Sequence, residues 1–219
     1  MEIKVLQKVL DRNRDMAATV RAKLKEKKLL MINLISSPGA GKTSLLEFLG
    51  EALAGKVRMA VIEGDVATDR DAIRLKRFGF PVVLINTDGG CHLDSHSISV
   101  ALKELDLDNL DLIFVENVGN LVCPAHFDLG ESFKLAIVST TEGDDKPIKY
   151  PMVFRDARAV VLNKTDLLPY TRFKRDVFLN DLHGINPSVP LFELSCVTMQ
   201  GVEAFKSWLL DQINEWISA

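Results

Sequence analysis

The chain has 219 residues, with 30 acidic and 27 basic side chains and a formal net charge of −3. Hydrophobic residues make up 47% and charged residues 26%, the balance of an ordinary globular protein, which excludes a disordered chain or a fibrous repeat. The longest near-continuous apolar run, Leu29 to Ile35, is far shorter than the ~20 residues that span a bilayer.

Residues 2–28 are expected to form an amphipathic helix docked on a single domain spanning 1–219, because apolar residues recur every three or four positions. This segment is charged throughout and lacks the central apolar stretch of a signal peptide, so we expect a cytoplasmic protein. Its nine Lys and Arg leave open contact with nucleic acid or a membrane surface. No aromatic residue interleaves these charges, which favours a solvated outer face without nucleic-acid or membrane partners.

Beyond residue 28, short apolar runs alternate with stretches of helical periodicity. The expected strands are continuous Val/Ile/Leu runs, typical of buried parallel strands, at 29–36, 57–64, 82–87, 112–117, 135–140, 159–163 and 189–194. Helices are expected at 43–54, 69–78, 94–105, 172–182 and 202–217. The alternation predicts an α/β three-layer sandwich, with a mostly parallel sheet of about seven strands and helices on both faces. Ligands of such folds bind at the carboxyl ends of the strands.

A phosphate-binding loop follows the first expected strand. The strict Walker A pattern begins with Gly where Ser36 stands here, but its Gly-Lys-Thr end is intact before a helix. Glycines let successive backbone N–H groups face the phosphates, and the helix N-terminus adds positive charge. Lys42 is the expected catalytic bridge between the β- and γ-phosphates, and the Thr43 hydroxyl the expected Mg²⁺ ligand. This P-loop NTPase pattern predicts nucleotide contacts by Ser37, Pro38, Gly39, Ala40, Gly41, Lys42, Thr43 and Ser44.

The sixth expected strand ends in an NKxD motif formed by Asn163, Lys164 and Asp166. The Asp166 carboxylate can accept hydrogen bonds from guanine N1–H and the exocyclic amine, whereas adenine would leave this charged acceptor unpaired. Asn163 is expected on the other edge of the base, with the stem of Lys164 over the ring. Ser195-Cys196 stands where GTPases place a Ser-Ala pair whose amides bond the guanine oxygen, so Cys196 is expected in the base pocket as a structural residue.

Two further strand ends carry acidic residues. Glu116 and Gly119 form an acid-x-x-Gly pattern typical of a γ-phosphate sensor, in which Glu116 holds Mg²⁺ and the Gly119 amide meets the phosphate. Asn120 follows, where Ras-like enzymes have a water-orienting Gln. Asp65, after the second strand, is the expected second Mg²⁺ ligand and the catalytic residue that positions water. A helix cap is the alternative role for Asp65.

Cys91-His92 follow the third expected strand, and Cys123 lies four residues beyond the sensor glycine. Both segments leave the same edge of the sheet, so the three side chains can meet. Two thiolates and an imidazole suit Zn²⁺, Ni²⁺ or Cu⁺, and a second subunit could complete such a three-ligand site. Inert buried cysteines and a capping histidine are the alternative. Whether His96 or His126 joins the site is left open.

Six stretches of the sequence resemble the HypB family, the GTPases that assist nickel insertion into nickel–iron hydrogenase. They lie at 36–43, 63–72, 89–94, 116–125, 141–151 and 163–166. The resemblance implies a SIMIBI-class P-loop fold, slow GTP hydrolysis, homodimerisation on GTP binding, and a nickel or zinc site at Cys91, His92 and Cys123. It also implies two partners, a small nickel metallochaperone and the hydrogenase large-subunit precursor.

In the family's dimer a lysine reaches the partner's nucleotide, and the resemblance assigns this role to Lys149, with Lys146 the other candidate. The chain lacks the N-terminal cysteine cluster or His-rich tract of some members, so N-terminal nickel storage is not expected. The related urease GTPase resembles it less, because its metal motif reads Cys-Pro-His and here Cys123-Pro124 is followed by Ala125. A urease-type GTPase and a GTP-binding regulator with inert cysteines remain the alternative functions.

Overall fold

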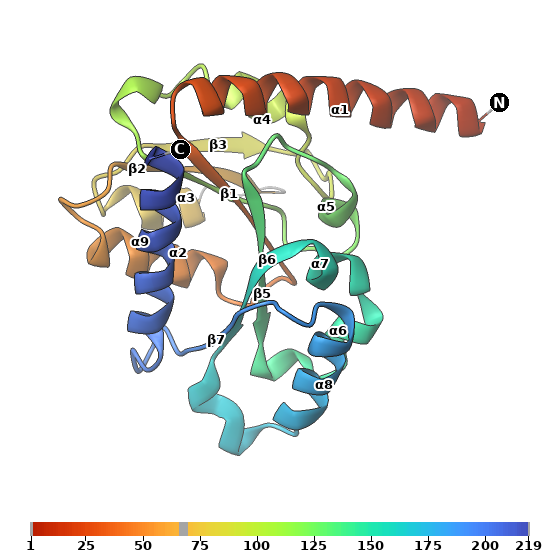
Figure 1. Ribbon diagram of the computed structural model, residues 1–219, viewed down its shortest axis with the longest axis vertical. Helices are drawn as coiled ribbons and strands as arrows, with labels where there is room; N and C mark the ends of the chain where they lie inside the picture. Colours follow the sequence, from red (N-terminus) through yellow and green to blue (C-terminus); the bar gives the residue numbers. More distant parts are fainter. Residues whose placement is uncertain (1, 66–69, 219) are drawn as a thin grey trace.

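The computed structural model describes residues 2–65 and 70–218, with side chains from residue 10 onward. In this part of the chain, seven strands form one parallel sheet in the order β3-β2-β4-β1-β5-β6-β7 (Figure 1). The strands are β1 (Leu30–Ser36), β2 (Met59–Asp65), β3 (Val82–Asn86), β4 (Leu112–Glu116), β5 (Phe133–Ser139), β6 (Ala157–Asn163) and β7 (Leu191–Glu193). The predicted α/β fold is confirmed, and the sheet is parallel throughout.

Helices of very different length precede, connect and follow these strands. They are α1 (Glu2–Glu26), α2 (Lys42–Ala52), α3 (Arg70–Lys76), α4 (Ser95–Ala101), α5 (Cys123–His126), α6 (Lys146–Lys149), α7 (Pro151–Asp156), α8 (Arg175–Ile185) and α9 (Val202–Ser218). Among the described residues, no helix combines the length and apolar character that crossing a membrane requires.

The sheet is covered on both faces because its strands are apolar on both sides. On β1, Leu30, Ile32 and Leu34 are buried in one core with α2 and α9. Met31 is buried on the opposite face with side chains of α1 and α4, and Ile35 lies in a cluster with α7 and α8. This alternation produces the predicted three-layer sandwich, with β1 at the centre of the sheet (Figure 1).

Several predicted boundaries are wrong. The helix expected at 94–105 ends at Ala101. The prediction was too long because Leu102 and Leu105 continue the apolar spacing as buried core residues although they lie outside the helix. The helix expected from 172 begins at Arg175, because the Lys174 amide donates to Asp144 Oδ2 at 2.8 Å. The predicted start of the third helix, residue 69, lies outside the described residues. The short helices α5, α6 and α7 were not predicted, because one turn carries no periodicity; each has a proline in its first turn.

Candidate functional site

The phosphate loop joins β1 to α2 and depends on two glycines. Gly39 and Gly41 adopt φ angles of +76° and +101°, in the left-handed region that favours glycine. Gly41 also caps α2, and a Cβ there would lie 2.3 Å from Nδ2 of Asn163. The backbone therefore wraps tightly at the helix N-terminus and against the NKxD segment.

Lys42 and Thr43 begin α2 and are both buried. The Lys42 ammonium donates to Ser36 Oγ at 3.0 Å, so the serine that replaces the first Walker A glycine holds the lysine. Burial lowers the pKa of Lys42 below its ordinary value, and the charge of Glu116 opposes this effect. The Thr43 hydroxyl donates to Glu116 Oε1 at 2.8 Å, which brings the two expected Mg²⁺ ligands together.

Glu63 is a buried carboxyl group that sequence reasoning missed. It stands opposite Glu116 in the register of β2 and β4 and is 2% exposed. Burial raises the pKa of Glu116 to about 7, and burial together with the charge of Glu116 raises the pKa of Glu63 to about 8. Among the described residues, Oε2 of each has no hydrogen-bond partner. Carboxylate oxygens beside a threonine hydroxyl fit Mg²⁺. Only strand register reveals this pair.

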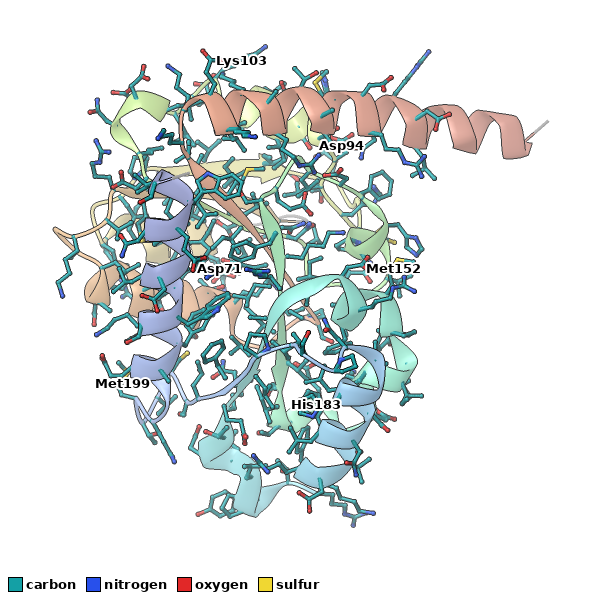
Figure 2. The ribbon with its side chains drawn as sticks, viewed as in Figure 1. Asp71, Asp94, Lys103, Met152, His183 and Met199 are labelled. Carbon is teal, nitrogen blue, oxygen red and sulfur yellow. The ribbon has the colours of Figure 1, made fainter. Side chains whose placement is uncertain are left out.

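A cavity of about 450 Å³ lies above these groups, at the carboxyl ends of β1, β2 and β4. Its lining joins the phosphate loop, Glu63, Asp65, Glu116, Gly119 and Lys164 with two residues of α3 that were not predicted, Asp71 and Arg74. Arg74 binds Glu47 at 2.7 Å and Asp71 at 2.9 Å, and Figure 2 shows Asp71 inside the molecule's outline near α2. The residues that would precede α3 as its cap lie outside the described part of the chain, so the cap role of Asp65 is not tested.

The NKxD segment is hydrogen-bonded to the phosphate loop. Asn163 Nδ2 donates to the Ala40 carbonyl at 3.0 Å, and Lys164 Nζ donates to the Gly39 carbonyl at 2.7 Å. Oδ1 of Asp166 is buried and has no hydrogen-bond partner among the described residues. A buried carboxylate oxygen at this edge fits the paired N–H donors of guanine.

The loop after β7 narrows one prediction. The Ser195 amide donates to the Gln200 carbonyl at 3.0 Å, so of the two amides expected to face the guanine oxygen only that of Cys196 remains. The Ser195 hydroxyl instead accepts from the amides of Val197 and Thr198, which fixes the turn. Burial raises the pKa of Cys196 to about 11, against a hydrogen bond with Asn163 that lowers it. Its thiol therefore stays protonated near neutral pH and is a structural neighbour of the NKxD segment.

Cys91, His92 and Cys123 come together in the structure. One ligand atom from each lies within 4.8 Å of the others, and Cys91 Sγ is 3.4 Å from His92 Nδ1. The ring of His92 packs against Phe127 with centroids 3.8 Å apart, which fixes its orientation. A hydrogen bond with Cys123 raises the pKa of Cys91, and burial lowers the pKa of His92, which favours the neutral imidazole, the form that binds a metal ion.

The other histidines stay outside this group. Among the described residues, the group of ligand atoms that lie within 4.8 Å of one another contains neither His96 nor His126. Figure 2 places His183 beside α8, far from Asp94. Asp94 caps α4 and follows the loop that carries Cys91 and His92, so His183 lies far from the metal-ligand group.

Lys149 and Lys146 lie on the short helix α6, away from the cavity lining. Lys149 is exposed and pairs with Asp145 at 2.5 Å, while the Lys146 ammonium sits 5.6 Å from the centre of the Tyr150 ring. Contact of either lysine with a partner's nucleotide stays a prediction.

Known proteins are similar to this chain over the part that carries these site residues. The nucleotide-binding domain of the CobW/HypB/UreG family matches residues 30–193. The hydrogenase maturation factor HypB of Azotobacter vinelandii is 46% identical over 207 residues, or 94% of this chain and 68% of that protein. Two solved structures, each 36% identical, cover 93% of the chain. HypB from Archaeoglobus fulgidus gives a TM-score of 0.87 and is covered completely, and HypB from Helicobacter pylori in complex with nickel gives 0.88 and is 96% covered.

Proposed function

Because this chain belongs to the HypB family of hydrogenase maturation factors, we propose that it is a GTP-hydrolysing metallochaperone that assists nickel insertion into nickel–iron hydrogenase. The observation that carries the proposal is the Cys91, His92 and Cys123 group, in which Cys123 lies four residues after Gly119, the glycine expected to sense the γ-phosphate. A GTP-binding regulator with inert cysteines has no need for three ligand atoms within 4.8 Å.

GTP hydrolysis would use the buried groups around the cavity. Lys42 and the phosphate-loop amides would hold the phosphates, and Thr43 and Glu116 would hold Mg²⁺, which would supply further positive charge. Asp65 lines the same cavity and orients the attacking water. Asp166 selects guanine. Catalysis then rests on positioning and charge, the usual means of phosphoryl transfer.

Nickel is the cargo of this protein rather than a resident cofactor. Cys91 is exposed and His92 and Cys123 are half-buried, so the group can exchange a metal ion with a partner. Three ligands leave the coordination shell of Ni²⁺ or Zn²⁺ incomplete. In our proposal a second copy of the chain completes the site in a GTP-bound homodimer. Zn²⁺ would occupy the same donors.

In this role the protein would act in the cytoplasm. It would receive nickel from a small metallochaperone and pass it to the hydrogenase large-subunit precursor.

Asp166→Asn is expected to weaken GTP binding about 10- to 150-fold, since a hydrogen bond to a charged group contributes ~1.5–3 kcal/mol. The amide replaces one acceptor with a donor that faces guanine N–H groups. Equilibrium binding of GTP and ATP measures the change in preference, with the exposed Asp211→Asn as control. An unaltered preference for GTP over ATP would show that Asp166 does not read the base.

The same variants test the function in cells. In a strain lacking its own copy of this gene, wild-type protein and Asp211→Asn should restore nickel to the hydrogenase large subunit, and Asp166→Asn should not. Restored nickel in urease but not in hydrogenase would instead favour the urease-type function. Full restoration by Asp166→Asn would contradict a role for GTP in delivery.

A further inference from the structure

Two asparagines tie the metal-binding dipeptide to the segment that carries the phosphate sensor. We call residues 117–122, between β4 and α5, the switch segment. Asn117 Oδ1 accepts from the amide of Leu93, the residue after His92, at 3.2 Å. Asn120 Nδ2 donates to the carbonyl of Cys91 at 3.3 Å. The two peptide groups on either side of His92 are therefore held by one short segment.

The Asn117 side chain is held by a series of buried hydrogen bonds that runs through Asn33 on β1 to Glu131. It is 1% exposed, and its Nδ2 donates to Asn33 Oδ1 on β1 at 3.2 Å. Asn33 in turn donates to Glu131 Oε1 at 3.3 Å, and Glu131 Oε2 accepts from the Leu129 amide at 2.6 Å. With both its donor and acceptor sides engaged, the amide of Asn117 has one orientation. Its contact with Leu93 is thus directional and not interchangeable with packing.

Asn120 connects the two loops that carry metal ligands. Its Oδ1 accepts from the Val122 amide at 2.8 Å, immediately before Cys123, while its Nδ2 reaches Cys91. A movement of Asn120 would therefore act on both thiol-bearing segments at once.

The switch segment also touches the phosphate loop. It begins directly after Glu116, which accepts from Thr43. A Cβ at Gly119 would lie 2.9 Å from Pro38 Cα, so Gly119 packs directly on the loop. A phosphate that displaces Gly119 would carry Asn117 and Asn120 with it.

We propose that Asn117 and Asn120 are positioning residues, which transmit the nucleotide state from Gly119 to the Cys91–His92 dipeptide and so set metal affinity. This inference rests on the proposed function. It extends that function, because Cys123 alone would couple one ligand to the switch segment and the two asparagines couple all three. A purely structural role would change stability but not the dependence of metal binding on nucleotide.

The test compares Ni²⁺ affinity in the presence of GDP and of a non-hydrolysable GTP analogue. For wild-type protein the two affinities should differ ~5- to 150-fold, the range of typical allosteric coupling. Asn120→Ala keeps all three ligands and should bring this ratio about 2- to 10-fold closer to one, the effect of one hydrogen bond. Asn117→Ala should act in the same direction. Asn109→Ala, which removes an exposed asparagine whose side chain donates to Asp106, should leave the ratio unchanged.

A second variant separates the contact of Asn120 with Cys91 from its contact with Val122. Asn120→Asp keeps the acceptor for Val122 and removes the donor to Cys91, so it should lose coupling as Asn120→Ala does. If the buried Asn117→Ala fails to fold, the two Asn120 variants decide. Variants that retain the wild-type ratio would overturn this inference and leave the proposed function standing. A ratio of one in the wild-type protein would overturn both the positioning role of the two asparagines and the nucleotide control of metal binding.

Discussion

Replacing Lys42 with alanine is expected to reduce GTP hydrolysis at least about 100-fold, the usual cost of removing one preorganised charge-stabilising donor. Lys42 is the one lysine of residues 36–43, and its ammonium is buried at the N-terminus of α2 and held by Ser36. Affinity for GTP should fall as well, because the lysine neutralises the β- and γ-phosphates. Single-turnover phosphate release and equilibrium binding of a fluorescent GTP analogue measure the two effects.

Lys103→Ala provides the control for this prediction. Lys103 is exposed, and Figure 2 shows it at the outer edge of the molecule near α4. The fold should survive Lys42→Ala, since burial already lowers the pKa of that ammonium and disfavours its charge. Wild-type turnover in folded Lys42→Ala protein would mean that residues 36–43 are not the phosphate loop.

Cys123→Ala is expected to weaken Ni²⁺ binding at least about 100-fold. Loss of a hydrogen-bond partner to a metal ligand typically costs 10- to 100-fold in affinity, and loss of a thiolate ligand should cost more. Binding of GTP should stay within about twofold of wild type, because the side chain of Cys123 does not line the nucleotide cavity. Competition against a chromophoric chelator under anaerobic conditions measures the metal affinity.

The matched control is Cys196→Ala. Burial raises the pKa of Cys196 to about 11, and the residue packs beside the NKxD segment rather than near Cys91. Its removal should leave Ni²⁺ affinity unchanged. If Cys123→Ala binds Ni²⁺ as tightly as Cys196→Ala does, the three-ligand group is not the nickel site.

The strands of this fold were predictable because each is apolar on both sides. β1 buries Leu34 against α2 and α9 and its neighbour Ile35 on the other face, so a continuous apolar run reports a central parallel strand. Helix ends were less predictable. Leu102 and Leu105 keep helical spacing beyond the end of α4, since spacing records burial and not backbone conformation.

The candidate site divides along the same line. Lys42 and Asp166 could be assigned roles in advance because each belongs to a local motif with its own chemical logic, and Cys123 because it follows a strand end at the same edge of the sheet as Cys91 and His92. Glu63 and Asn117 were assigned no role in advance, because strand register places the first beside Glu116 and a tertiary hydrogen bond joins the second to Leu93. Such contacts between distant segments leave no local pattern in the sequence.

The most direct test of nucleotide-controlled metal binding is the ratio of GTP-analogue to GDP affinity, measured by titration with and without saturating Ni²⁺. Linkage requires the metal to change this ratio by the same factor by which the nucleotide changes metal affinity, ~5- to 150-fold for typical coupling. We predict such a change in the wild-type protein and its loss in Cys123→Ala. An identical ratio with and without Ni²⁺, in protein shown to bind the metal, would contradict coupling between the two sites and leave a GTPase whose metal group is independent of its nucleotide.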